Sequence, residues 1–178
     1  MKAIRLARHT WDVLLLADDQ GRCEVMEVLE RMERQGGAGM LALLRRDGPT
    51  ALVLTRQGLP VLDRTNRGGA ALLHRGAYVL EEASAGPRVV VIASGSEVVL
   101  ALEARRRLEA EGVPVRVVAM PSWELFDRQD PAWRHAVLPP GVPRVSVEAG
   151  RTMGWERYVG ERGASVGIDR YGLSAPGK

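Results

Sequence analysis

The stretch that decides the fold is RVVVIASGSE at residues 88–97. Residues 88–93 contain a continuous β-branched run, Val89–Ile92, which is typical of a strand that is covered on both faces of a sheet. The next four residues make a turn, and the apolar spacing that follows, up to about Glu111, predicts a helix. Gly112 is well placed to end that helix. The stretch therefore predicts a buried strand, a turn and a helix in succession.

The same order of elements recurs toward the C-terminus. Further strands are predicted at Val113–Met120, Arg144–Glu148 and Ala164–Ile168, with helical stretches near Asp130–Val137 and Gly154–Val159. Strands that alternate with helices form βαβ units, which build a mostly parallel sheet with helices on both faces. The sequence therefore predicts an α/β fold: a three-layer α/β/α domain with a mostly parallel mixed sheet over residues 88–178.

A partial α/β segment precedes this domain. Trp11–Ala17 and Ala51–Thr55 have the pattern of short strands, and the apolar residues between Val25 and Met32 recur at helical spacing. The segment from Asp63 to Gly76 has mixed charge, two adjacent glycines and no firm periodicity, which favours a connector. We therefore expect a partial domain at residues 1–66, a linker at 67–87 and the main domain at 88–178.

Composition limits the classes of function. Of the 178 residues, 46% are hydrophobic and 26% are charged, which is ordinary for a globular chain. The net charge of +3 comes from arginines that are spread along the chain, and only eight residues are aromatic, so we expect no nucleic-acid partner. The apolar runs are too short to cross a bilayer or to form a signal peptide. Cys23 is the only cysteine, so no internal disulfide can form, and we expect a cytoplasmic protein with no membrane partner.

The turn Ser94-Gly95-Ser96-Glu97 has two interpretations. A glycine turn before a helix offers unpaired N–H groups to phosphate or another anion. Alternatively, Ser94 or Ser96 caps the helix by accepting a backbone N–H, while Glu97 complements the helix dipole. The capping interpretation is favoured, because Glu97 would repel an anion and no Gly-x-Gly-x-x-Gly or Walker sequence is present.

Glu148 is a second candidate, because it stands at the end of a predicted strand. Ligands of open α/β sheets gather at the carboxyl ends of strands, so this carboxylate either acts in a site or serves as a cap or an interface residue. The histidines give no metal-ligand spacing and no Ser–His–Asp arrangement, so we expect no metal site and assign no catalytic residue. The large aromatic residues are expected in a core or an interface, namely Trp123, Phe126, Trp133 and Trp155.

Arg56 is the most informative single residue. It follows the predicted strand Ala51–Thr55, whose carboxyl end could present the guanidinium to a phosphate as a bidentate donor. Spacing alone favours a surface ion pair instead.

Several motifs, in order, resemble the C-terminal portion of transketolase. They begin with DGPTALVLTRQ at 47–57, GAYVL at 76–80 and ASGSEVVL at 93–100. MPSWELFD at 120–127, VLPP at 137–140 and VEAG at 147–150 follow. WERY at 155–158, DRYG at 169–172 and SAP at 174–176 complete the series. The resemblance covers roughly Arg45 to Pro176 and implies the end of the pyrimidine-binding domain followed by the transketolase C-terminal domain.

The resemblance implies a function for the complete enzyme. Transketolases move a two-carbon ketol unit between sugar phosphates with thiamine diphosphate and a divalent metal, and Arg56 falls on the arginine that contacts the substrate phosphate. The cofactor-binding domain and the catalytic glutamate of the family do not match any part of this sequence, so we expect the chain to bind no cofactor and to be inactive alone. The expected partner is a second copy or a transketolase N-terminal half. The alternative is a non-catalytic dimerisation or regulatory module derived from a transketolase.

Overall fold

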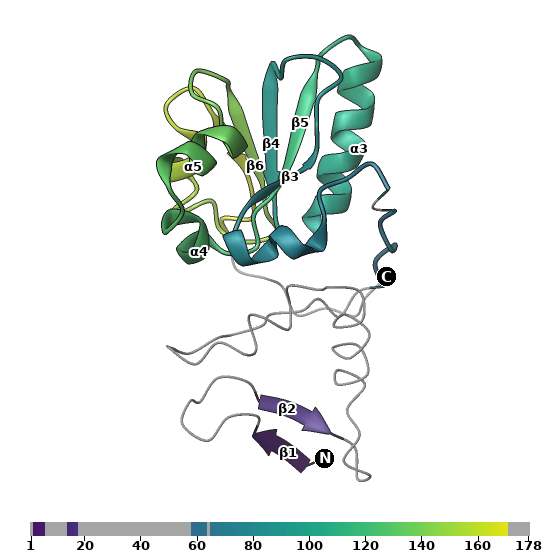
Figure 1. Ribbon diagram of the computed structural model, residues 1–178, viewed down its shortest axis with the longest axis vertical. Helices are drawn as coiled ribbons and strands as arrows, with labels where there is room; N and C mark the ends of the chain where they lie inside the picture. The colour runs from purple at the N-terminus through teal and green to yellow at the C-terminus, as the bar shows by residue number, and fades with distance from the viewer. Residues whose placement is uncertain (1, 6–13, 18–57, 64, 171–178) are drawn as a thin grey trace. The chain divides into compact units, whose positions relative to one another are not determined.

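The computed structural model describes residues 2–5, 14–17, 58–63 and 65–170 (Figure 1). The chain divides into two compact units, Met1–Arg56 with Gly69–Arg75, and Gln57–Gly68 with Gly76–Lys178. In the first unit β1 (Lys2–Arg5) pairs antiparallel with β2 (Leu14–Ala17), and η1 (Ala70–Arg75) is a short 3₁₀ helix. β2 lies within the strand expected at Trp11–Ala17. The strand and the helix expected between Val25 and Thr55 lie outside the described residues.

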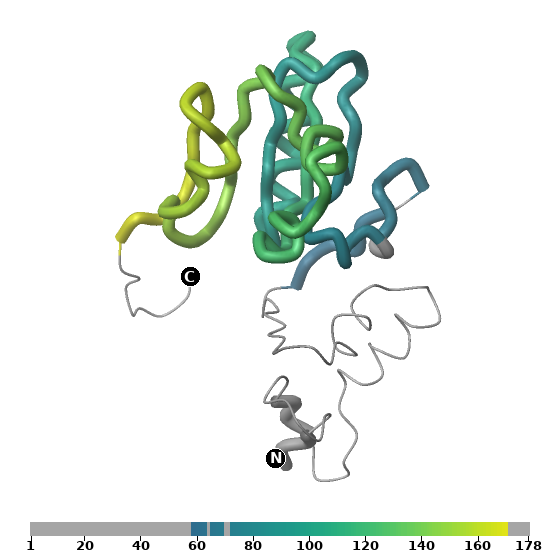
Figure 2. The backbone as a smooth tube through the Cα atoms, turned by 60° about the vertical axis from the view of Figure 1, so that its left-hand side comes forward, coloured from purple at the N-terminus to yellow at the C-terminus, as the bar shows by residue number. Residues whose placement is uncertain are grey.

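The second unit is built on a five-stranded sheet in the order β3-β5-β4-β6-β7. The strands are β3 (Tyr78–Glu81), β4 (Val89–Ala93), β5 (Val115–Ala119), β6 (Arg144–Val147) and β7 (Ala164–Val166). β4 to β7 run parallel to one another, and β3 joins the edge of β5 in the antiparallel direction. β7 is the strand at the opposite edge, where the yellow C-terminal segment lies in Figure 2.

Helices cover both faces of this sheet, which confirms the predicted α/β/α class. They are α3 (Glu97–Ala110), α4 (Trp123–Asp127), α5 (Pro131–Val137) and α6 (Glu156–Val159). α3 packs on β4 and β5, where its only buried residue is Ala101. On the other face Val90 and Ile92 of β4 join Phe126, Val137 and Tyr158, contributed by α4, α5 and α6, in one buried cluster. Because side chains alternate along a strand, β4 is buried by both helical layers.

The C-terminal end of α3 is fixed as the sequence predicts. Gly112 takes a φ of +78° and donates its N–H to the carbonyl of Glu109, while Val113 donates to Leu108. These two hydrogen bonds form a Schellman motif, in which glycine adopts the left-handed backbone without a Cβ clash. The chain then turns directly into β5.

β3 lies within residues 67–87, where the sequence predicts a linker between the two parts of the chain. Tyr78 and Leu80 are buried, and the intervening residues are less so, which is the period of a strand with one covered face. Ion pairs hold the outer side: Glu81 contacts Arg67 at 2.5 Å and Arg105 of α3 at 2.8 Å. Four residues give too short an alternation to identify a strand that is stabilised mainly by its pairing with β5.

α4 is a second element that the sequence pattern did not predict. Its five residues follow Ser122, whose hydroxyl accepts the backbone N–H of Leu125 at 3.3 Å. The short helix buries Phe126 against the sheet.

No helix in the described part of the chain is both long enough and apolar enough to cross a membrane.

Gly76 and Gly112 provide a matched test of the backbone. Both have a positive φ, but a Cβ on Gly76 would overlap the Phe126 nitrogen and the Ser122 carbonyl, whereas a Cβ on Gly112 would meet no atom within 4 Å. We expect Gly112→Ala to lower the free energy of unfolding by about 1 kcal/mol from backbone strain alone. Gly76→Ala should cost at least about 3 kcal/mol, because α4 must also move. Urea denaturation of the two variants measures the difference, and equal losses would contradict this packing.

Candidate functional site

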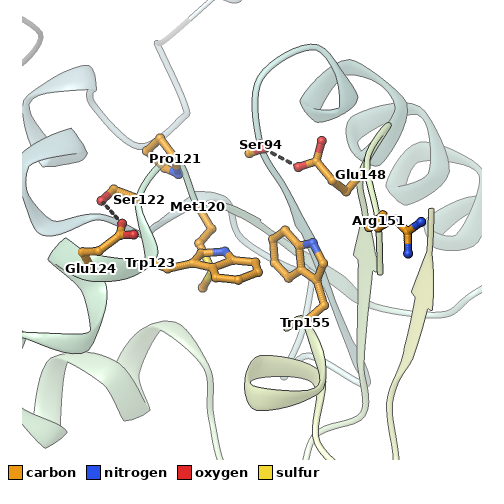
Figure 3. Close-up of a pocket in the computed structure, with 9 residues that line it drawn as sticks. All are labelled: Ser94, Met120, Pro121, Ser122, Trp123, Glu124, Glu148, Arg151 and Trp155. Atoms are coloured by element: carbon orange, nitrogen blue, oxygen red, sulfur yellow. Dashed lines mark hydrogen bonds between the residues drawn. The ribbon is translucent and has the colours of Figure 1, made fainter. Parts of the chain in front are cut away.

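A cavity of about 320 Å³ opens at the carboxyl ends of the three central strands. Residues that directly follow β4, β5 and β6 contribute to it, and the other lining residues come from α4 and from the loops beyond the strands (Figure 3). The lining residues are Ser94, Met120, Pro121, Ser122, Trp123, Glu124, Glu148, Arg151 and Trp155. The cavity therefore lies where open α/β sheets bind their ligands, at the carboxyl ends of the strands.

The strand order explains why a crevice forms at this point. From β4 the chain crosses through α3 to β5 on one side, whereas β6 lies on the other side of β4. The loops after β4 and β6 therefore leave the sheet in opposite directions, which is the topological switch point of an open α/β sheet. Ser94 belongs to the first loop and Glu148 to the second.

A hydrogen bond joins these two loops. The Ser94 hydroxyl donates to Glu148 Oε2 at 2.6 Å, although the residues are 54 positions apart. The backbone N–H of Glu148 donates in turn to the carbonyl of Val166 in β7 at 3.0 Å. A hydroxyl–carboxylate pair at this length is a charge-assisted hydrogen bond. The structure thus brings together two residues that the sequence singled out separately.

The turn before α3 has a geometry different from the favoured capping interpretation. Ser96 stands at the N-cap in a helical conformation, and its side chain makes no capping hydrogen bond. Its hydroxyl donates instead to Glu97 Oε1 at 2.6 Å, and the backbone N–H of Glu97 donates to the Ser94 carbonyl at 3.1 Å. Gly95 takes a φ of +50°, which lets the chain turn sharply from β4 into α3. The Ser94 hydroxyl donates to Glu148, and the Ser96 hydroxyl donates to Glu97 and makes no capping hydrogen bond to the helix.

Aromatic rings form the second wall of the cavity. The rings of Trp123 and Trp155 meet edge to face with centroids 5.0 Å apart, and Tyr158 lies 5.3 Å from Trp123. Trp155 and Tyr158 are only 2% and 4% exposed, in accord with the core position expected of large aromatics. Trp123 is partly exposed and lines the cavity. The sequence did not predict that Trp123 lines the cavity, because its neighbours Pro121 and Ser122 do not indicate which way the side chain points.

Tyr158 connects this aromatic cluster to a polar pair. Its hydroxyl donates to Asp127 Oδ1 at 3.1 Å, and Arg157 contacts the other oxygen of Asp127 at 2.6 Å. Burial, together with the nearby negative charge of Asp127, raises the pKa of Tyr158 to about 12. The phenol is therefore held neutral and acts as a hydrogen-bond donor.

Two further predictions concern the phosphate contact Arg56 and a metal site. Arg56 lies outside the described residues. Within the described ranges no group of three or more His, Cys, Asp or Glu side chains could hold a metal ion.

The fold and this strand-end crevice are those of a domain that recurs in a known protein family. Residues 76–178 match the family model described as the transketolase-like TK C-terminal domain. The chromosomal transketolase of Cupriavidus necator is 53% identical over 139 residues, which cover 78% of this chain and 20% of that relative. The transketolase of Geobacillus stearothermophilus is 48% identical over 143 residues, covering 79% and 21%.

The solved structures agree with the sequence relatives. Transketolase from Leishmania mexicana superposes with a TM-score of 0.69 at 39% identity, covering 86% of this chain and 23% of that one. The chain belongs to the transketolase family, and residues 76–178 form its C-terminal domain. It spans only 20% and 21% of the length of the two curated relatives named above.

The raised pKa of Tyr158 predicts a loss of stability at alkaline pH. A phenol that holds its proton more tightly when folded than when unfolded stabilises the fold fully below pH 10.0, and the contribution is lost as the pH rises toward about 12. We expect about 2 kcal/mol of unfolding free energy to disappear across this window. In Tyr158→Phe this part of the pH dependence should be absent, as measured by urea denaturation along the pH series. An unchanged slope in that variant would contradict the assignment.

Proposed function

We propose that this chain is the C-terminal part of a transketolase and contributes to ketol transfer between sugar phosphates only within a complete enzyme. The observation that carries the proposal is the match of residues 76–178 to the transketolase-like C-terminal domain, and the Ser94–Glu148 hydrogen bond at the switch point of the sheet supports it. In this position a ligand-binding α/β domain would offer free donors to a phosphate group. Here the loops offer a carboxylate that is already bonded to the neighbouring loop.

Thiamine diphosphate and its divalent metal do not fit the described strand ends. A diphosphate needs convergent N–H donors or cations, and Glu148 contributes a carboxylate to the lining of the crevice. Glu124 adds a second carboxylate to the lining. We therefore derive no chemical step through the cofactor in this chain. In the proposal, the rest of the complete enzyme binds it.

The proposed contact of this chain with substrate is Arg56. In the complete enzyme its guanidinium binds the phosphate of the sugar, for which a planar, bidentate donor is well suited. The proposed partner is a second copy of the chain or a transketolase N-terminal half. The proposed compartment is the cytoplasm, where a lone Cys23 stays reduced.

One observation favours the second candidate, a non-catalytic association module. Met153, Val166 and Ile168 have exposed fractions of 76%, 58% and 45%, although all three are large apolar residues. Gly150 accepts the backbone N–H of Ile168 at 2.7 Å, so the loop after β6 runs beside the end of β7. Apolar side chains that gather at a sheet edge are typical of a contact surface.

The two candidates differ in a reconstitution experiment. We expect the purified chain to show no ketol transfer from a ketose phosphate, with or without thiamine diphosphate and Mg²⁺. Addition of a Cupriavidus necator transketolase that lacks its matching C-terminal region should restore activity. Association without rescue would support the non-catalytic module. Turnover by the isolated chain would contradict the proposal.

Arg56 is tested in the reconstituted enzyme. Arg56→Gln removes the charged donor, and we expect the KM for a ketose phosphate to rise by about tenfold or more, while the KM for an unphosphorylated ketose stays unchanged. Arg45→Gln, a change of the same kind at the start of the matching region, serves as the control. An equal effect on both substrates would contradict a phosphate contact.

A further inference from the structure

Trp155 carries a polar group that the fold leaves unused. Its side chain is 2% exposed, and it lines the cavity at the strand ends. Across the described residues its indole Nε1–H donates to no acceptor, and yet this nitrogen is not sealed from solvent. The indole of Trp133, in contrast, donates to the Ala77 carbonyl at 3.2 Å. A buried Trp usually finds a partner for its N–H, so the free donor of Trp155 points to a group that comes from outside the domain.

An acceptor faces the same space. Glu148 lines the cavity, and only its Oε2 receives a hydrogen bond, from Ser94. Oε1 has no hydrogen-bond partner within the described part of the chain. In Figure 3 the indole nitrogen of Trp155 lies on the side of its ring that faces Glu148. The cavity thus presents one free N–H donor and one free carboxylate oxygen from neighbouring walls.

A hydroxyl group satisfies both sides at once, because it accepts one hydrogen bond and donates another. A pair of adjacent hydroxyls gives the same match with more freedom in spacing. Trp123, which is partly exposed, supplies an indole surface beside them. The C–H face of a sugar ring or a polyol chain packs on such a surface while its hydroxyls make the polar contacts.

The charges of the lining favour a neutral ligand over a phosphorylated one. Glu148 and Glu124 both contribute carboxylates, and Ser122 donates its hydroxyl to Glu124 at 3.3 Å. Arg151 also lines the cavity, and its side chain points away from the two indoles in Figure 3. A phosphate placed between the two carboxylates would be repelled.

We propose that the cavity bounded by Trp155, Glu148 and Trp123 binds a neutral polyhydroxylated small molecule, a sugar or polyol with adjacent hydroxyls. One hydroxyl accepts the Trp155 indole N–H and a hydroxyl of the same pair donates to Glu148 Oε1. The proposal concerns the C-terminal domain as it stands and does not depend on ketol transfer by the complete enzyme.

NMR titration of the 178-residue chain with ribitol tests this site. The four tryptophans each give one indole N–H resonance. We expect the Trp155 and Trp123 resonances to shift in a saturable way, with a dissociation constant of about 1 mM for a ligand of this size. The Trp133 resonance is an internal control, because its N–H is already donated to Ala77. A Trp155 resonance that does not move at saturating ribitol overturns the proposal.

Two pairs of variants separate the site from the fold. Trp155→Phe keeps an aromatic ring without the donor, and Trp133→Phe makes the same change outside the cavity lining. Glu148→Gln keeps the shape without the charge, and Glu161→Gln is its control at an exposed position outside the lining. We expect each site variant to weaken ribitol binding about tenfold and each control to leave it unchanged. Glu148→Gln decides the question if Trp155→Phe does not fold, and equal binding by Glu148→Gln and the wild type overturns the proposal.

Four further probes test the chemistry of the ligand. cis-1,2-Cyclohexanediol should bind more tightly than cyclohexanol, because only the diol offers adjacent hydroxyls. Propylammonium and inorganic phosphate test for a cationic and an anionic ligand. Tighter binding of either ion than of ribitol, or equal binding of the diol and the alcohol, overturns the assignment.

Discussion

β4 lies between β5 and β6, and its parallel hydrogen bonds with both strands determine where every loop of the domain leaves the sheet. The strand is buried on both faces, by α3 on one side and by the aromatic cluster on the other. Apolar, β-branched residues suit a strand that is covered on both faces, which accounts for the run Val89–Ile92. The crossover through α3 then places Ser94 at the one point of the sheet where neighbouring loops diverge.

The same constraint accounts for the character of the crevice. In this topology the switch point is open unless side chains close it, and here the Ser94–Glu148 hydrogen bond connects the two diverging loops. The carboxylate that makes this bond also makes the crevice unsuited to a diphosphate. A space remains between Glu148 and the two indoles. It contains one unused hydrogen-bond donor, from Trp155, and one unused carboxylate oxygen, from Glu148. The binding site that we propose for this domain therefore does not depend on the cofactor.

Much of the second unit could be predicted from the sequence, because its elements have strong periodicity. β4, α3, β5, β6 and β7 lie within a few residues of their predicted ranges, and Gly112 ends α3 as expected. β3 and α4 could not be predicted in this way. Each is held mainly by partners that are distant in the sequence.

The sequence predicted individual residues of the candidate site but not their contacts with one another. Ser94 and Glu148 were singled out because each follows a strand, but their contact depends on the order of the strands, which alternation alone does not specify. Ser96, which stands at the N-cap of α3, has a helical backbone and makes no capping hydrogen bond, and a short sequence pattern does not specify this conformation. The free indole donor of Trp155 follows from packing, for which single-sequence patterns carry no signal.

The central claim is that the Ser94–Glu148 bond fixes the carboxyl ends of the sheet. Amide hydrogen exchange in Ser94→Ala tests it most directly. The account predicts that protection of the Glu148 N–H, which is donated to Val166, falls about tenfold because one hydrogen bond of the loop is lost. Protection of Val91, in the middle of β4, should stay unchanged. Equal protection of Glu148 in the variant and the wild type, or a uniform loss over both residues, would contradict the claim.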